Sequence, residues 1–232
     1  MPGDTPQTFV MTNVVPSRTV PFEDPLSSVA AAVAKLHTLW RKATYPFASF
    51  GRGVWIHPSA MLSRTIAPAI ELGDSVIIRN HAWLNSFDIA GPGDVKITIG
   101  HHTVVNAQCV ISAKNRIQIE DHVMVSACSL IMDHNHAYED VTRPIQQQGA
   151  SPGGTIRIEQ GCWIGHGAAI VCNQGELVLG RNCIVAANSL VTRSFPPYSV
   201  IVGNPARVAK QFDPEQQVWL GSGARAAASQ AQ

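Results

Sequence analysis

The sequence has little net charge, few cysteines and no long apolar run, and each of these absences argues against a protein class. Its 17 lysines and arginines nearly balance 16 acids, and the net charge of +1 provides no electrostatic footprint for nucleic acid or an anionic membrane. Its five cysteines form no CxxC pair, which argues against a disulfide framework and a thiolate zinc site. No apolar run approaches a membrane span, and the first ten residues lack the basic flank and apolar core of a secretory signal. We therefore expect a cytoplasmic protein with reduced cysteines, built on one main domain.

A six-residue repeat is the main positive feature of the sequence. Aliphatic residues recur at intervals of six in five triplets: Leu72, Ile78, Leu84; Ile99, Val105, Ile111; Ile119, Val125, Ile131; Ile158, Ile164, Ile170; and Leu179, Val185, Val191. A smaller side chain follows many of them by four residues: Val76, Ala82, Thr103, Cys109, Val123, Ser129, Cys162, Ala168, Cys183 and Ser189. Turn formers lie between, so each hexad is expected to be a short strand and a corner.

The repeat predicts a solenoid, because a six-residue unit cannot bury its own apolar side chain. It needs neighbours stacked at the roughly 4.8 Å spacing of paired strands. Successive triplets begin 20 residues apart at Ile99 and Ile119, and 21 apart at Ile158 and Leu179, which suits three sides and a corner. We therefore expect an all-β triangular prism. The longer steps from 72 to 99 and from 119 to 158 predict extruded loops, which in solenoids gather on a functional face.

Residues 1–50 are expected to form an N-terminal extension with an amphipathic helix. Its apolar positions have helical spacing: Leu26, Val29, Val33, Leu36 and Trp40. Ser27 or Ser28 can cap the first turn.

Residues 51–210 are expected to be the hexapeptide-repeat domain, which begins with a less regular coil that caps the solenoid. Residues 211–232 are expected to form a short helix and a disordered tail. Asp213 is a natural N-cap and Pro214 suits the first helical position, whereas the last dozen residues are small and polar.

The hexads, the interrupting DHNH at 133–136, the run CWIGHGAAIV and the closing GNPARV resemble the hexapeptide-repeat acyltransferases, which form a left-handed parallel β-helix. More narrowly, they are similar to maltose and galactoside O-acetyltransferases and their polysaccharide-modifying relatives. The resemblance covers about 97–208. It implies acetyl-coenzyme A as co-substrate, no required metal, and a homotrimer with active sites between subunits. The implied reaction transfers an acetyl group to a saccharide hydroxyl in surface polysaccharide or glycoconjugate biosynthesis.

In this family a histidine at the start of the extruded loop acts as general base, and the repeat places His136 rather than His134 there. An imidazole with an unperturbed pKa near 6.5 suits removal of a proton from a hydroxyl, which is a poor nucleophile. The alkoxide would attack the thioester carbonyl while backbone N–H groups hold the oxyanion. No covalent intermediate is needed, and the chain has no G-x-S-x-G elbow. Asp133 and His134 are candidate acceptor-binding residues, and either could orient His136.

The resemblance implies further contacts. Asn106, one coil earlier, matches an asparagine that contacts the acceptor. The positions that match the coenzyme groove are Trp163, His166, Ala187, Thr192, Arg193 and Arg207. The two arginines would meet coenzyme phosphates through charge-assisted hydrogen bonds. Acceptor specificity would depend on 133–154, on 87–94 and on the N-terminal helix.

Other functions remain open on the same architecture. A zinc-dependent γ-type carbonic anhydrase would need three histidines around a metal. His102 and His122 occupy the same place in adjacent coils and are expected to stack, while His81 lies on a different side. A streptogramin-type antibiotic O-acetyltransferase is a second acceptor class, and a non-catalytic scaffold is the third alternative.

Overall fold

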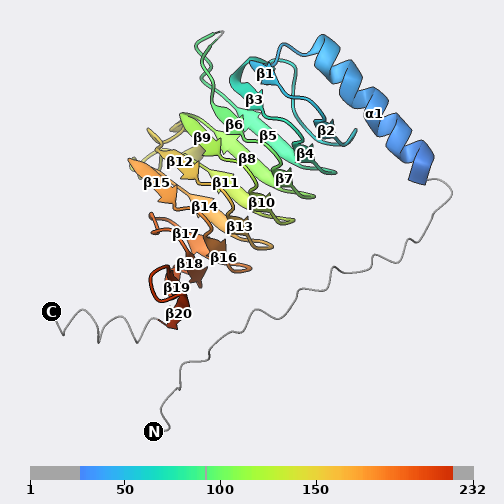
Figure 1. Ribbon diagram of the computed structural model, residues 1–232. Helices are drawn as coiled ribbons and strands as arrows, with labels where there is room; N and C mark the ends of the chain where they lie inside the picture. Colours follow the sequence, from blue (N-terminus) through green and yellow to red (C-terminus); the bar gives the residue numbers. More distant parts are fainter. Residues whose placement is uncertain (1–26, 92, 222–232) are drawn as a thin grey trace, which may run out of the picture.

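The computed structural model describes residues 27–91 and 93–221, so the predictions for Leu26 and the tail from 222 onward lie outside the described residues (Figure 1). The described chain is mostly β, with parallel sheets and one α-helix. No helix in these residues is long and apolar enough to cross a membrane.

The strands form three sheets. Sheet A contains β1 (Ser49–Phe50), β3 (Ile70–Leu72), β6 (Ile97–Ile99), β9 (Arg116–Ile119), β12 (Thr155–Ile158) and β15 (Glu176–Leu179). Sheet B contains β2 (Trp55–Ile56), β4 (Ile77–Ile78), β7 (Val104–Val105), β10 (Met124–Val125), β13 (Trp163–Ile164), β16 (Ile184–Val185), β18 (Ser199–Val202), β19 (Arg207–Asp213) and β20 (Val218–Gly221). Sheet C contains β5 (Trp83–Ser86), β8 (Val110–Ala113), β11 (Leu130–Met132), β14 (Ala169–Val171) and β17 (Leu190–Val191).

The chain visits sheets A, B and C in turn, and each strand pairs in parallel with its equivalent one coil away (Figure 1). The register joins equivalent hexad positions, such as Ile111 with Ile131 and Val105 with Val125. All fifteen triplet residues are at most 1% exposed, and so are the ten smaller residues four places further on. The predicted repeat and its two inward positions are therefore confirmed.

The outward-facing rows of the three sheets differ in polarity. The row on sheet B is apolar: Trp55, Ile77, Val104, Met124, Trp163, Ile184 and Val200. So is the row on sheet C: Trp83, Val110, Leu130, Ala169 and Leu190. The row on sheet A is largely polar: Ser49, Glu71, Thr98, Gln118, Arg157 and Val178. Sheets B and C thus present apolar outer faces, and sheet A does not.

The helix α1 (Ser27–Thr44) lies across the N-terminal end of the stacked coils (Figure 1). It closes the edge of sheet B, because Thr38 Oγ1 accepts the N–H of Ile56 in β2 at 3.0 Å. The buried Arg41 donates to the carbonyl of Ala60 at 2.7 Å. The helix therefore satisfies backbone groups that an edge strand would otherwise leave unpaired.

Two segments leave the regular coil where the long steps predict them. The first is 87–96, between β5 and β6, and the second is 133–154, between β11 and β12. The second contains the 3₁₀ turn η2 (Ile145–Gln147), and another, η1 (Ala67–Ala69), precedes β3. Both extruded segments leave at the edge between sheets C and A, which we call the C–A edge.

The predicted short helix after Asp213 is wrong. Residues 207–221 form the hairpin β19–β20, which continues sheet B through antiparallel pairing with β18. Asp213 Oδ1 does accept the N–H groups of Glu215 and Gln216, at 2.9 and 3.1 Å, but these bonds close a turn. An Asx turn and a helix N-cap share this bond, and the strand pairing of the following residues decides between them.

Candidate functional site

The extruded loop 133–154 begins with a buried carboxylate. Asp133 is 0% exposed. Its side-chain oxygens accept three backbone N–H groups of the turn between β8 and β9, from Lys114, Asn115 and Arg116, at 2.7, 2.8 and 2.8 Å. Asp133 therefore ties the root of the loop to the preceding coil.

His134 is buried against this carboxylate. Its Nδ1 lies 2.9 Å from Asp133 Oδ1, and the ring of Phe87 packs edge-on with centroids 4.5 Å apart. Because a carboxylate only accepts, the bond assigns the proton to Nδ1 and leaves Nε2 as the acceptor in neutral imidazole. Phe87 comes from the other extruded segment, so the two loops meet at His134.

His136 is exposed, and its backbone forms a bridge with Ala150. Its imidazole makes no hydrogen bond within the described residues. Asp133 therefore orients His134 and has no hydrogen bond to His136.

Both ends of the loop are held in place. Lys114 Nζ donates to the carbonyl of Ser151 at 2.5 Å, and Asn115 Nδ2 donates to those of Pro152 and Gly154 at 3.0 and 3.1 Å. Inside the loop, the N–H of Asn135 donates to Ser151 Oγ at 3.0 Å. These bonds give the histidine-bearing segment a defined path, although it lies outside the sheets.

Most of the other candidates lie at the edge between sheets B and C, which we call the B–C edge. Asn106 Nδ2 donates to the carbonyl of Val125 at 2.9 Å, and Trp163 Nε1 donates to Ser126 Oγ at 2.9 Å. Trp163 is 45% exposed. The candidates that share this edge or the adjoining end of sheet B are Asn106, Trp163, His166, Ala187 and Arg207.

The remaining candidates, Thr192 and Arg193, follow β17 and lie at the C–A edge with the two histidines. The guanidinium of Arg193 sits 5.0 Å from the centroid of the Phe195 ring. The chain crosses sheet C between the two edges, a path of roughly 20 Å at 3.3 Å per residue. One copy of the chain therefore does not bring His136 and Trp163 together.

Comparisons with known proteins show which proteins this chain resembles. No protein-family model matches the chain. It is 32% identical over 180 residues to a probable acetyltransferase of Mycobacterium tuberculosis, covering 76% of this chain and 53% of that protein. It is 26% identical over 121 residues to Escherichia coli WbbJ, named as a lipopolysaccharide biosynthesis O-acetyl transferase, covering 50% of this chain and 60% of WbbJ. The chain thus spans between half and two thirds of these relatives.

Among solved structures, AntD of Bacillus cereus has a similar fold. AntD is an N-acyltransferase, and its crystal structure contains dTDP and 3-hydroxybutyryl-CoA. The TM-score is 0.62 at 22% identity, over 77% of this chain and 89% of AntD. The chain is thus similar to acetyltransferases, consistent with the hexapeptide-repeat family.

The protein carries its thiols mostly inside the coil. Burial raises the pKa of the Cys109 thiol to about 11 and also raises that of Cys172, so neither is a thiolate near neutral pH. Cys128 is the exposed one of the five cysteines. The buried thiols act as small core side chains.

The predicted stacking of His102 and His122 is confirmed, with ring centroids 5.0 Å apart and planes 11° from parallel. His81 lies at a different corner of the coil, in the turn between sheets B and C. Within the described residues, no group of three or more histidine, cysteine or acidic side chains is arranged to hold a metal ion. The stacked pair therefore has no third ligand there.

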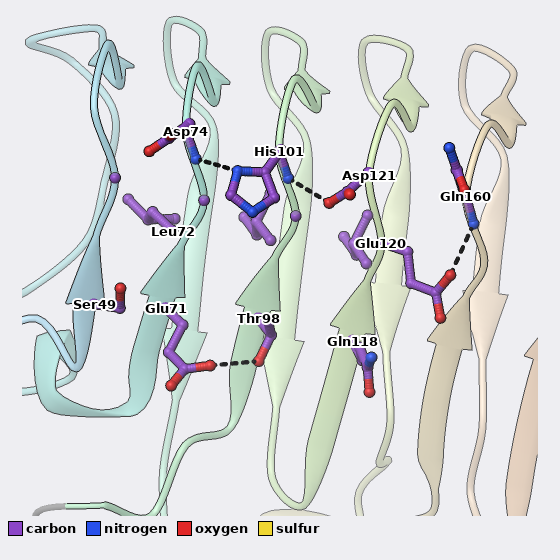
Figure 2. A pocket seen from close by; sticks show the side chains of 15 residues that line it. Ser49, Glu71, Leu72, Asp74, Thr98, His101, Gln118, Glu120, Asp121 and Gln160 are labelled. Carbon is purple, nitrogen blue, oxygen red and sulfur yellow. Dashed lines mark hydrogen bonds between the residues drawn. The ribbon is translucent and has the colours of Figure 1, made fainter.

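The protein also has a groove that the sequence did not predict. The groove has a volume of about 470 Å³ and runs across the first coils of sheet A (Figure 2). In it, the Thr98 hydroxyl donates a hydrogen bond to Glu71 Oε2 at 3.3 Å. The carboxylates in the groove mostly accept hydrogen bonds from backbone N–H groups at the corners of the coil. Asp121 Oδ1, for example, accepts the N–H of His101 at 2.7 Å. Hydrogen bonds from the backbone N–H and the guanidinium of Arg52 lower the pKa of Asp74. None of the predicted site residues lines this groove.

Proposed function

We propose that this protein transfers an acetyl group from acetyl-coenzyme A to a saccharide-type hydroxyl acceptor in surface polysaccharide or glycoconjugate synthesis. The observation that carries the proposal is the clamped, histidine-bearing loop that leaves the coil at Asp133. The names of the relatives support it, since one is an acetyltransferase and WbbJ is named for lipopolysaccharide biosynthesis. We assign the activity to the repeat domain, residues 51–210. We also propose that the coil of this domain is left-handed.

His136 is the proposed general base, by its place in the repeat. It would remove the proton from the acceptor hydroxyl as the oxygen attacks the thioester carbonyl. The carbonyl oxygen becomes an oxyanion held by backbone N–H groups, and the thiolate then leaves as the acetyl ester forms. His134, Asp133 and Asn106 would contact the acceptor.

The coenzyme would lie in a groove built from two copies of the chain. Trp163 is an exposed aromatic surface for the pantetheine arm, and Arg193 and Arg207 are exposed cations for its phosphates. His166, Ala187 and Thr192 complete the proposed groove.

The apolar outer faces of sheets B and C support a homotrimer. Sheets B and C have apolar outer rows that expose Trp83, Met124 and Trp163 by 43 to 45% each, whereas sheet A is polar. Contact through sheets B and C would bury these rows. It would also bring the C–A edge of one copy, with His136, to the outer end of sheet B in the next, whose outer row contains Trp163. The site is then complete only between copies.

The first experiment is a calorimetric titration of the full chain with acetyl-coenzyme A, followed by thiol release with a panel of sugars that carry hydroxyl or amino groups. Saturable binding near one site per chain and release with hydroxyl sugars are expected. Release with amino sugars alone would assign N-acylation, the activity in AntD's name. Absence of coenzyme binding would contradict the proposal and favour a scaffold.

The shared site has its own test. His136→Ala and Trp163→Ala would each be inactive alone, but refolding a mixture of the two should restore part of the activity. Mixed trimers contain some interfaces with both residues intact. No recovery in mixed oligomers would place the two residues in one subunit's site.

A further inference from the structure

The helix α1 is attached to the coil by an unusual face. The residues that face the first coil are Ala34, Thr38 and Arg41, which are buried, and the last two bond backbone groups of that coil. The inner face of the helix is thus small and polar. The apolar residues of an amphipathic helix normally face the protein core.

The apolar face of α1 points away from the protein. Val29, Val33, Leu36 and Trp40 follow one another at helical spacing, and each is more than half exposed, as is the adjacent Leu39. Exposed apolar patches of this kind mark protein or membrane contacts. We call these five residues the outer stripe. The helix crosses the end of the stack, away from the outer faces of sheets B and C (Figure 1).

The helix and first coil carry cations and no acid of their own, although Arg52 pairs with Asp74 of the next coil at 3.0 Å. From Ser27 to Ile70, the helix and first coil contain five cations and no acid: Lys35, Arg41, Lys42, Arg52 and Arg64. All 16 acids lie elsewhere in the chain, so the net charge of +1 conceals a local excess. Exposed Lys35 and Lys42 lie on α1 itself.

Two occupants could cover the outer stripe, and the charges distinguish them. A second copy meeting end to end would bring the cations of two α1 helices, Lys35 and Lys42 among them, close together, which like-charge repulsion opposes. An anionic lipid surface complements both the cations and the apolar side chains. Helices with Trp and Leu on one face, and Lys on a polar face, lie in the plane of the bilayer interface.

We propose that the outer stripe of α1 docks this enzyme, end on, onto an anionic membrane surface. The polar face of the helix stays bonded to the first coil, and the stripe enters the headgroup region. The repeat domain would then stand on the membrane with its coils stacked away from it. This docking is independent of the proposed reaction, although a lipid-linked saccharide acceptor would be brought close by it.

The test is co-sedimentation of the full chain with phosphatidylcholine vesicles, with and without phosphatidylglycerol. Binding is expected only with the anionic lipid and should weaken as salt rises. The double variant Val33→Asp/Leu36→Asp should lose roughly tenfold or more in partitioning. Lys35→Glu should lose roughly fivefold to tenfold at low salt.

Matched variants control for nonspecific effects. Val141→Asp places the same acid on a 94% exposed valine of the loop 133–154, and Lys210→Glu makes the same charge change on β19. Both should bind vesicles like the parent protein. Unfolding temperature and oligomeric state of the α1 variants should not change.

Three results would overturn the proposal: no binding of the parent protein to anionic vesicles at low salt, unchanged binding of the double variant, or loss of an oligomer in that variant. The last would make a second copy the occupant. Acetyl-coenzyme A binding, measured in the same preparations, tests the proposed reaction separately.

Discussion

The histidine pair allows a prediction in which stability and turnover respond in opposite ways. His136→Ala removes an exposed imidazole that makes no hydrogen bond within the described residues, so the free energy of unfolding should change by no more than about 0.5 kcal/mol. The same change removes the proposed base. Turnover should fall roughly a hundred to ten-thousand-fold, the usual contribution of a positioned general base.

His134→Ala should act mainly on stability. It removes the hydrogen bond to the Asp133 carboxylate and the edge-on contact with Phe87. A hydrogen bond to a charged group contributes about 1.5–3 kcal/mol and an aromatic pair about 0.5–1.5, so the free energy of unfolding should fall by about 2–4.5 kcal/mol. Asp133 keeps its three backbone donors and is not left unpaired. Turnover per folded molecule should fall less than in His136→Ala.

The measurements are urea unfolding and coenzyme-dependent thiol release at saturating acceptor. Near-normal turnover in His136→Ala would refute its role as base. If folded His134→Ala were the slower enzyme, the base would be His134, whose tautomer is set by Asp133. Repeat position would then have selected the wrong histidine.

Four further outcomes follow from the same contacts. Asp133→Ala should destabilise the protein by about 3 kcal/mol or more in urea unfolding, because it leaves three partly buried backbone N–H groups without their acceptor; an unchanged midpoint would contradict this anchoring role. Ile131→Ala, at a fully buried hexad position, should cost about 2–5 kcal/mol, and a smaller loss would mean that the coil collapses around the cavity. One thiol in five, that of Cys128, should react with a disulfide reagent in the native protein and all five after unfolding; fast reaction of a second would show that the core opens. Because the folded pKa of Asp74 lies below its ordinary 3.8, its contribution is present above that pH and is lost as pH falls through the lowered value; Asp74→Asn should therefore flatten the acid limb of the stability profile, and an unchanged limb would contradict the contribution of its bonds to Arg52.

The periodicity of the sequence determined the core of the protein. Every aliphatic residue of the five triplets is buried, because each six-residue step moves the chain to the next side of the coil and again points a side chain inward. The two long steps likewise predicted where the chain leaves the sheets. The position of a helix near 27–44 could also be predicted, since the spacing of its apolar residues is a local property.

Local signals failed where distant partners decide the structure. Asp213 and Pro214 predicted a helix, but pairing with β18 makes the segment a hairpin. The bonds between Asp133 and the turn at 114–116 depend on the stacking of two coils, so sequence reasoning could not decide which histidine the carboxylate orients. An amphipathic helix normally packs its apolar face on the protein, but the edge of sheet B needs hydrogen-bond partners, and α1 supplies them from its polar face. The sequence thus determined which residues are buried in the coil, whereas the tertiary structure decided which groups meet across coils, because those hydrogen bonds join residues far apart in the chain.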